Sequence, residues 1–237
     1  MIFNPPLIQA TLIKRYRRFL TDICLESGET ITIHCPNTGS MMNCLVPESQ
    51  AWYLPSTDPN RKTKGTWVLA TTPHGRIANI NTHYANTLVE EELSEGLIKE
   101  AGTFKKLRRE VKYGEENSRI DFCLTHEDDS LTYIEVKSVT LGFHDSTTAA
   151  FPDAVTERGT KHLRELTRLA ENGVKTILLY CVNLSGITAV RPADEIDPEY
   201  GKALRLAQKA GVKIIAYGTE LSPNEIKITH SIPVVMD

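Results

Sequence analysis

The chain has 237 residues, which is enough for one large domain or two small ones, and 41% of them are hydrophobic, as in a globular protein with a buried core. The formal net charge of −3 excludes a protein that coats nucleic acid through bulk positive charge. No apolar run approaches the roughly 18 residues of a membrane span, and the first residues do not resemble a secretory signal, so we expect no membrane segment. The five cysteines are odd in number and include no C-x-x-C pair, which indicates free thiols and a reducing, cytoplasmic compartment.

Charge is distributed unevenly along the chain. Residues 1–82 hold eight Lys/Arg and five Asp/Glu, and residues 83–237 hold the other 19 and 25. A basic first part beside an acidic second part fits phosphate contacts in one and metal-binding carboxylates in the other. Chance variation between two surfaces is the alternative.

The first 82 residues alternate short β-prone runs with turns and contain no convincing helix. Strands at such spacing predict a small closed barrel. Two polar loops stand out, CPNTGSMM at 35–42 and the basic DPNRKTKG at 58–65. The expected strands are 7–13, 19–25, 30–34, 51–54, 67–72 and 76–80.

Two clusters in this first part combine basic and aromatic residues. Basic side chains supply phosphate contacts and aromatic rings stack on bases, so both clusters are candidate nucleic-acid contacts. For the aromatic residues Tyr16 and Trp67, a place in the core is the alternative. The candidate basic residues are Lys14, Arg15, Arg17 and Arg18 in the first cluster and Arg61, Lys62 and Lys64 in the second.

The pattern changes near residue 82, where Asn81 or Thr82 can cap a helix that reaches about residue 98. A three-strand meander should follow, and then helices alternating with strands. This order predicts a second domain at 83–237, with a mixed sheet flanked by helices in an α/β fold. The expected strands are 107–113, 120–124, 132–139, 174–182, 212–217 and 225–235, and the expected helices begin at 156 and 198 and end near 170 and 211.

The segments SRIDF and YIEVKS carry the residues with the clearest chemistry. The two-residue period of a strand places Glu135 and Lys137 on one face, and pairing across the hairpin brings Asp121 beside Glu135. Two such carboxylates without a cation would repel each other, and a hard divalent ion removes the conflict. We therefore expect Mg²⁺ or Mn²⁺ here, and no other small-molecule cofactor. A surface hairpin with an ordinary carboxylate–lysine pair is the alternative.

This arrangement resembles the PD-(D/E)xK nuclease superfamily. The segments HCPNTGSM, EVKYG, SRIDF, IEVKSVTL and FPDAVTERGTKHL resemble more closely one family, that of sugar fermentation stimulation protein A, over essentially the whole chain. The resemblance implies a DNA-binding protein with an OB-like first domain, a nuclease-like second domain and a role in sugar, especially maltose, metabolism. It places metal ligation on Asp121 and Glu135 and catalysis on Lys137.

The first helix of the second domain should supply a third carboxylate to the metal. Helical spacing places Glu92 on the inward face of this helix. The amino-acid sequence that is usual for the family at this helix implies instead that Glu91 is the metal-binding carboxylate, and we favour Glu91. A solvated face carrying all the glutamates of this helix is the alternative.

The helix expected at 156 adds candidate phosphate contacts. Arg158 and His162 flank its apolar stripe near the sheet, and Lys161 lies on the far face. For His162, a packed core histidine is the alternative. Asp153, just before the helix, is a candidate N-cap or outer metal ligand.

These features favour a DNA-binding protein, largely indifferent to sequence, with a metal-dependent phosphodiesterase site. No helix-turn-helix or zinc-finger pattern supports reading of a defined operator. The runner-up is a DNA-binding regulator of sugar metabolism on the same fold without nuclease activity. A third possibility is an RNA-binding or RNA-processing factor, because OB-like barrels bind either nucleic acid.

Overall fold

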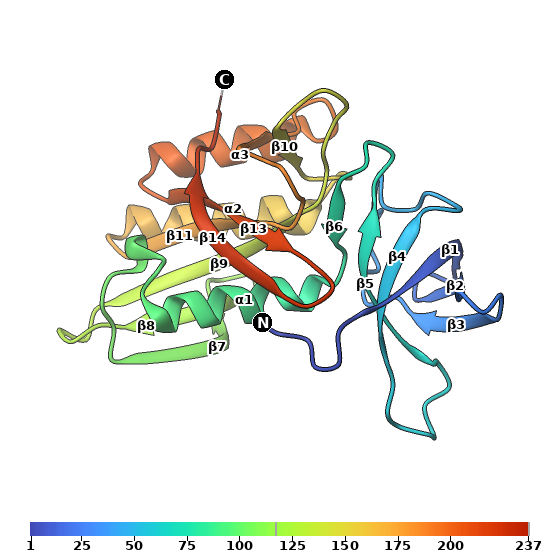
Figure 1. Cartoon of the computed structure of the whole chain (residues 1–237). Helices are drawn as coiled ribbons and strands as arrows, with labels where there is room; N and C mark the ends of the chain where they lie inside the picture. Colours follow the sequence, from blue (N-terminus) through green and yellow to red (C-terminus); the bar gives the residue numbers. More distant parts are fainter. Residues whose placement is uncertain (117, 237) are drawn as a thin grey trace.

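The computed structural model describes residues 1–116 and 118–236, which form two six-stranded sheets and a third sheet of two strands (Figure 1). The first sheet has the order β3-β2-β1-β4-β5-β6, and a parallel pairing of β3 with β5 closes it into a barrel. All six expected strands are present, so the predicted OB-like barrel is confirmed. The strands are β1 (Ile8–Tyr16), β2 (Leu20–Cys24), β3 (Thr30–His34), β4 (Gln50–Pro55), β5 (Gly65–Thr71) and β6 (Ile77–Asn79).

The second sheet has the order β14-β13-β11-β9-β8-β7. Strands β7, β8 and β9 form the expected antiparallel meander, β9, β11 and β13 run parallel, and β14 returns antiparallel. This is the mixed sheet of a restriction-endonuclease-like fold, as predicted. Its strands are β7 (Lys106–Tyr113), β8 (Ser118–Thr125), β9 (Leu131–Val139), β11 (Lys175–Val182), β13 (Lys213–Leu221) and β14 (Ile226–Ile232).

Helices cover both faces of this sheet. Along β11, Ile177 and Leu179 pack with the face that α1 (Thr82–Glu95) covers, whereas Leu178 and Tyr180 pack with α2 (Glu157–Glu171). Such a fully buried strand explains the continuous apolar run ILLYCV. Helix α3 (Pro198–Lys209) packs beside α2, and a 3-10 turn η1 (Lys99–Ala101) follows α1. No helix of the described chain is long and apolar enough to cross a membrane.

The helix starts follow their capping residues. Asn81 caps α1 by accepting a hydrogen bond from the backbone N–H of His83 at 3.2 Å, and α1 ends at Gly96 in the left-handed region, earlier than expected. Thr156 caps α2 by accepting from Gly159 N–H at 3.0 Å, so Asp153 is not the N-cap.

Two short strands were not predicted. Strands β10 (Thr148–Phe151) and β12 (Ala189–Pro192) pair in parallel in a small separate sheet. Each has only four residues, and they pair across some 40 residues of chain, so neither leaves a local signal.

The two halves of the molecule are joined closely. A domain boundary after residue 82 assigns the first residues of the chain to the barrel. These residues nevertheless run along the second domain to the turn between β13 and β14 (Figure 1). There the backbone N–H of Phe3 donates to Asn224 O and that of Leu7 donates to Pro223 O, both at 2.8 Å. The side chain of Arg76 binds the carbonyls of Ser146, Ser185 and Gly186 at 2.8–2.9 Å. The barrel is therefore held against the second sheet at defined points.

Candidate active site

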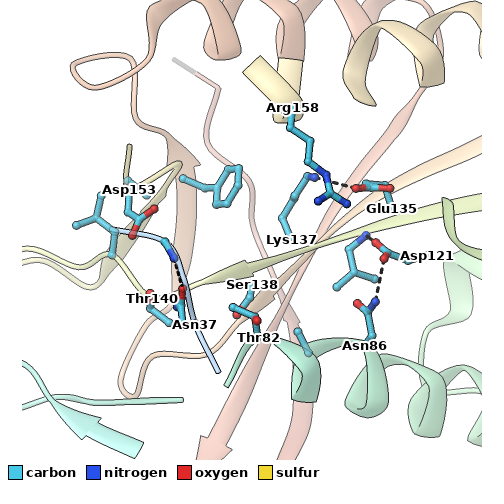
Figure 2. A pocket seen from close by; sticks show the side chains of 16 residues that line it. Asn37, Thr82, Asn86, Asp121, Glu135, Lys137, Ser138, Thr140, Asp153 and Arg158 are labelled. Atoms are coloured by element: carbon cyan, nitrogen blue, oxygen red, sulfur yellow. Dashed lines mark hydrogen bonds and ion pairs between the residues drawn. The ribbon is translucent and has the colours of Figure 1, made fainter. Parts of the chain in front are cut away.

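Asp121 and Glu135 come from neighbouring strands of the second sheet. Strands β8 and β9 pair Phe122 with Ile134, so each carboxylate lies one residue beyond this pair. Asp121 accepts hydrogen bonds from Val136 N–H at 2.7 Å and from the side-chain amide of Asn86, on α1, at 2.8 Å (Figure 2). Both of its partners are uncharged.

Glu135 has charged and polar partners on one oxygen only. It is 3% exposed, and its Oε1 accepts from Lys137 Nζ at 2.8 Å and contacts Nδ1 of His162, on α2. Its other oxygen, Oε2, is buried and has no hydrogen-bond partner in the described part of the chain. A buried carboxylate oxygen without a partner is costly, so Oε2 is a free acceptor that a water molecule or an ion could satisfy.

The two carboxyl groups have opposite pKa shifts. Burial, and then the neighbouring charge of Glu135, raise the pKa of Asp121 to about 6. Burial alone would also raise the pKa of Glu135, but Lys137 and His162 outweigh it and hold this pKa below its usual value. Asp121 is therefore the carboxylate that lacks a cation.

Asp121, Glu135 and Lys137 lie in a pocket of about 310 Å³. Helix α1 supplies Thr82 and Asn86 to its wall, and α2 supplies Arg158, which is exposed. The barrel contributes as well, through Asn37 and Gly39 of the loop at 35–42 (Figure 2). The remaining lining residues are Ala85, Asp121, Glu135, Val136, Lys137, Ser138, Thr140, Leu141, Ala150, Phe151 and Asp153.

Arg15 fixes the barrel loop that reaches the pocket. Its guanidinium donates to Asn37 O at 2.9 Å and to Gly39 O at 3.1 Å, and a third bond goes to Arg18 O at 2.8 Å. Ser40 then donates from its hydroxyl to Asp153 Oδ2 at 3.0 Å, which ties the loop to the second domain. Arg15, expected to contact nucleic acid, is instead engaged within the protein.

Glu91 does not reach the site. Its carboxylate pairs with the N-terminal amino group of Met1 at 3.0 Å, and neither Glu91 nor Glu92 lines the pocket. The expectation that Glu91 adds a third carboxylate therefore disagrees with the structure. Helix α1 instead contacts Asp121 through Asn86. The sequence did not indicate Asn86, because its side chain is an amide and a metal ligand was expected to be acidic.

The candidates on α2 separate into different roles. His162 is 4% exposed and contacts Glu135, so it supports that carboxylate from inside rather than lying on the surface as a phosphate contact. Arg158 lies in the pocket wall as expected, and Lys161 lies outside it, partly exposed. Asp153 lines the pocket through the carboxylate that Ser40 binds.

The basic residues of the barrel keep an exposed cluster at the β1–β2 turn. Lys14, Arg17 and Arg18 are exposed there, and Phe19 beside them is 48% exposed. The hydroxyl of Tyr16 donates to Asp22 at 3.1 Å. Phe19 is therefore the more accessible aromatic residue of the cluster.

In the second basic cluster the aromatic residue is buried. Trp67 lies in the core and donates from its indole N–H to Leu69 O at 2.8 Å, so it cannot stack on a base. Lys62 and Lys64 are exposed, and Arg61 binds the hydroxyls of two nearby threonines.

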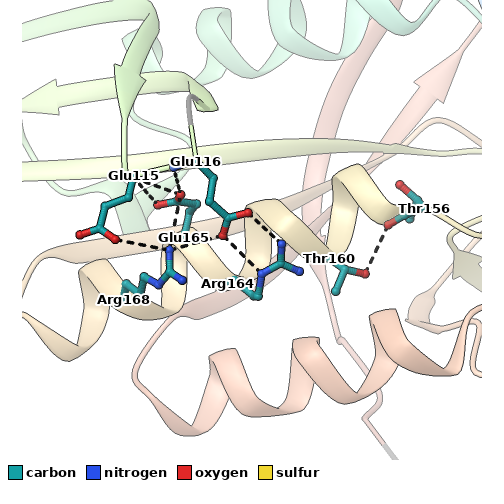
Figure 3. Close-up of polar contacts among 7 residues, drawn as sticks. All are labelled: Glu115, Glu116, Thr156, Thr160, Arg164, Glu165 and Arg168. Atoms are coloured by element: carbon teal, nitrogen blue, oxygen red, sulfur yellow. Dashed lines mark hydrogen bonds and ion pairs between the residues drawn. The ribbon is translucent and has the colours of Figure 1, made fainter.

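The turn between β7 and β8 is fixed on α2 (Figure 3). The buried carboxylate of Glu165 accepts from the backbone N–H groups of Glu115, at 3.1 Å, and Glu116, at 2.6 Å. Arg164 adds an ion pair with Glu116 at 2.9 Å. The clamp links β8, which carries Asp121, to the helix that carries His162.

The pocket fits one hard divalent ion better than a softer one. Within residues 1–116 and 118–236, no group of three His, Cys, Asp or Glu side chains is arranged to hold a metal ion. Mg²⁺ typically takes one or two carboxylates and completes its shell with water and substrate phosphate oxygens. Asp121 and the free oxygen of Glu135 match this donor set.

Comparison with known proteins agrees with this geometry. Residues 13–80 match the model of the SfsA N-terminal OB domain, and residues 83–225 match that of the sugar fermentation stimulation protein RE domain. The chain belongs to the sugar fermentation stimulation protein A (SfsA) family. It is 58% identical to the homologue of Pseudomonas fluorescens (strain SBW25) over all of both chains, and 58% identical to that of Azotobacter vinelandii over 236 residues, again all of both chains.

A solved SfsA structure shows the same fold. The structure of Pyrococcus furiosus SfsA in complex with Ca²⁺ is 25% identical to this chain, with a TM-score of 0.88 over 99% of this chain and 98% of that one. The two-part architecture is therefore that of SfsA proteins.

Proposed function

We propose that this chain binds DNA largely without regard to sequence and hydrolyses its phosphodiester bonds with Mg²⁺ or Mn²⁺ at Asp121 and Glu135. The observation that carries the proposal is the buried, unpartnered Oε2 of Glu135, beside Asp121 in a pocket that also contains Lys137 and Arg158. The Ca²⁺ named with the Pyrococcus furiosus relative supports a hard divalent ion.

The residues of the pocket then have distinct tasks. Asp121 and Glu135 would hold the ion, which when bound lowers the pKa of a water molecule and polarises a phosphoryl oxygen. Lys137 offsets the charge that develops on the phosphate, and Arg158 binds the phosphate at the rim. The water oxygen forms a bond to phosphorus and gives up a proton to solvent, the bond to the leaving oxygen breaks, and the leaving oxygen takes up a proton from solvent. His162 and Asn86 hold the two carboxylates in place.

The two parts of the chain divide this work. In residues 1–82, Lys14, Arg17 and Arg18 at the β1–β2 turn supply phosphate contacts, and Phe19 supplies a ring for stacking. Lys62 and Lys64 add positive charge on the loop at 58–65. Residues 83–237 carry the hydrolytic site.

One observation favours a DNA-binding regulator of sugar metabolism that does not cleave. Helix α1 offers the amide of Asn86 rather than a carboxylate, so among the residues that the structure describes no third carboxylate joins Asp121 and Glu135 in a metal-binding group. A weaker metal site would leave binding as the main activity.

Calorimetry with Mn²⁺, combined with cleavage assays on single-stranded, duplex and branched DNA, tests the proposal. We expect the wild type to bind Mn²⁺ and cleave, Glu135→Gln to lose at least about tenfold in Mn²⁺ affinity, and Lys137→Met to bind Mn²⁺ but cleave about 10²-fold more slowly. Asp145→Asn, an exposed acidic residue outside the pocket, is the control. Mn²⁺ binding without cleavage would favour the regulator, and no Mn²⁺ binding with or without DNA would refute the metal site.

DNA binding is tested separately in chelator. Replacing Arg17 and Arg18 together with Ala should weaken binding and reduce the slope of log affinity against log salt by about 2, because two phosphate contacts are lost. The melting temperature should not change, since both side chains are exposed. Lys202→Ala, on the exposed side of α3, is the control. Unchanged affinity would remove the β1–β2 turn from the binding surface.

A further inference from the structure

We infer that the pocket accepts one unpaired nucleotide, so that the DNA cut by this protein is single-stranded at the scissile phosphate. The inference rests on the proposed function and names its substrate class. Two observations support it. The pocket combines phosphate-binding and base-recognising side chains, and a loop of the barrel forms one of its walls.

The pocket has a first part with two carboxylates and two basic side chains, and a second part in which none of the described residues has a basic side chain. In Figure 2, Asp121, Glu135, Lys137 and Arg158 gather at one side, whereas Asn37 and Thr140 lie at the other. Strand β9 continues for four residues beyond Glu135, roughly 13 Å at about 3.3 Å per residue, and Thr140 directly after it still lines the pocket. The pocket therefore extends well beyond the carboxylates that would meet the phosphate.

The second part has the groups that recognise a base. Asn37 and Thr140 offer donors and acceptors without charge, and Phe151 offers an aromatic ring, the surface on which unpaired bases stack. Asp153 also faces this part, and its carboxylate disfavours a second phosphate there. A base beside the scissile phosphate fits both observations.

The walls limit which DNA can reach the floor. Glu135 is almost fully buried, Arg158 borders one side, and the loop at 35–42 borders another. Three hydrogen bonds from Arg15, and the bond from Ser40 to Asp153, hold this loop in place. A pocket of about 310 Å³ is at the small end of the range for small-molecule sites.

A paired base cannot enter such a pocket unless it leaves the helical stack, which costs free energy that an unpaired base does not pay. The metal-binding floor and the uncharged base-recognising groups of the second part together thus select an unpaired strand. The barrel loop contributes directly to that selection, because it supplies Asn37 and Gly39 to the pocket.

Initial cleavage rates with Mn²⁺ on three DNA substrates of one sequence test the inference: a single strand, a blunt duplex, and a duplex with a single-stranded overhang. We expect the single strand to be cut at least tenfold faster than the blunt duplex, and the third substrate to be cut in its unpaired part. Single-stranded RNA of the same sequence is the fourth substrate.

A pocket-filling variant gives a matched test. Thr82 is exposed and lines the pocket, and its neighbour His83 is exposed and lies outside the lining. Thr82→Trp should lower single-strand cleavage at least tenfold with Mn²⁺ affinity and melting temperature unchanged, whereas His83→Trp should cleave like the wild type.

The outcomes separate this inference from the proposed function. Blunt duplex cut as fast as the single strand, or Thr82→Trp as active as His83→Trp, would overturn the inference and leave the nuclease intact. Faster cleavage of RNA would overturn the choice of DNA. No cleavage of any substrate would overturn both.

Discussion

Asp121 and Glu135 are neighbours, but the protein gives only one of them a cation. Lys137 and His162 both bind Glu135, and Asp121 receives hydrogen bonds from an amide and a backbone N–H. The pKa of Asp121 therefore rises to about 6 through burial and the charge of Glu135. A divalent ion beside Asp121 would remove this unfavourable charge, which links metal binding to stability.

We predict that Asp121→Asn stabilises the metal-free protein at neutral pH. The carboxyl group ionises less readily in the folded chain, with a pKa of about 6 against 3.8, so its charge lowers the free energy of unfolding above pH 6. The destabilisation fades as the pH falls from about 6 toward 3.8, because the folded chain takes up the proton first. Two pKa units are worth about 3 kcal/mol, and we expect a gain of about 2 kcal/mol because asparagine keeps one of the two acceptors.

Urea denaturation in chelator at pH 7.5 and at pH 4.5 measures this difference. The gain should be present at pH 7.5 and mostly lost at pH 4.5. Asp145→Asn, at an exposed carboxylate, should change the free energy of unfolding by less than about 0.5 kcal/mol at either pH. A variant less stable than the wild type at pH 7.5 would contradict the argument.

The sequence predicted the neighbouring places of Asp121, Glu135 and Lys137, because strand alternation puts Glu135 and Lys137 on one face and pairing across the hairpin brings Asp121 beside them, and the family resemblance implied their roles. It could not identify Asn86, whose contact with Asp121 depends on how α1 packs on the sheet. Five residues separate Asn86 from Glu91, and at about 100° per residue they lie about 140° apart around the helix. When Asn86 faces Asp121, Glu91 must point elsewhere, and it meets Met1.

At the level of elements, the β7–β8 turn depends on the clamp from α2. Gly114 in this turn has φ 65°, and a Cβ there would lie 1.7 Å from Glu165 Oε2. We predict that Gly114→Ala lowers the free energy of unfolding by about 3 kcal/mol or more, because the Glu165 carboxylate must leave the N–H groups that it caps. The same change should weaken Mn²⁺ binding, since β8 carries Asp121.

Thermal denaturation can separate the steric effect from backbone strain. Gly173→Ala is the control, because this glycine also has positive φ, 79°, but its added Cβ would meet nothing within 4 Å. It should cost about 1 kcal/mol. Glu165→Ala should also destabilise the protein, and in that background Gly114→Ala should add only the roughly 1 kcal/mol of backbone strain expected for Gly173→Ala. Equal losses for the two glycine variants would show that Glu165 does not limit the turn.

The long elements could be predicted because their hydrophobic periods are local, whereas their contacts could not. The loop at 35–42 was conspicuous in the sequence, yet its place in the pocket depends on Arg15 and Ser40. Likewise the sequence left two places open for Trp67, a base-stacking surface and the core, and only the packing of the barrel decides for the core. Such outcomes follow from three-dimensional packing rather than from sequence spacing.

The whole molecule is expected to behave as one unit because its halves share a core. Ala78 and Ile80 of the barrel side pack in the same apolar cluster as Val139 and Leu184 of the second domain. Asn79, fully buried, donates from its backbone N–H to Asn183 O at 3.0 Å. The barrel wall of the pocket therefore cannot move without disturbing these contacts.

We predict a single unfolding transition by calorimetry, with equal calorimetric and van't Hoff enthalpies. Arg76→Ala should lower the melting temperature by roughly 4–8 °C, because carbonyls of Ser146, Ser185 and Gly186 lose a charged donor worth about 2 kcal/mol. Lys62→Ala, at an exposed residue of the barrel, is the control and should leave the melting temperature unchanged. Arg76 lies outside the pocket lining, so Mn²⁺ affinity should persist while DNA cleavage falls as the barrel wall shifts. Two resolved transitions in the wild type would mean that the barrel and the second domain fold independently, and the barrel loop could then not act as a fixed wall.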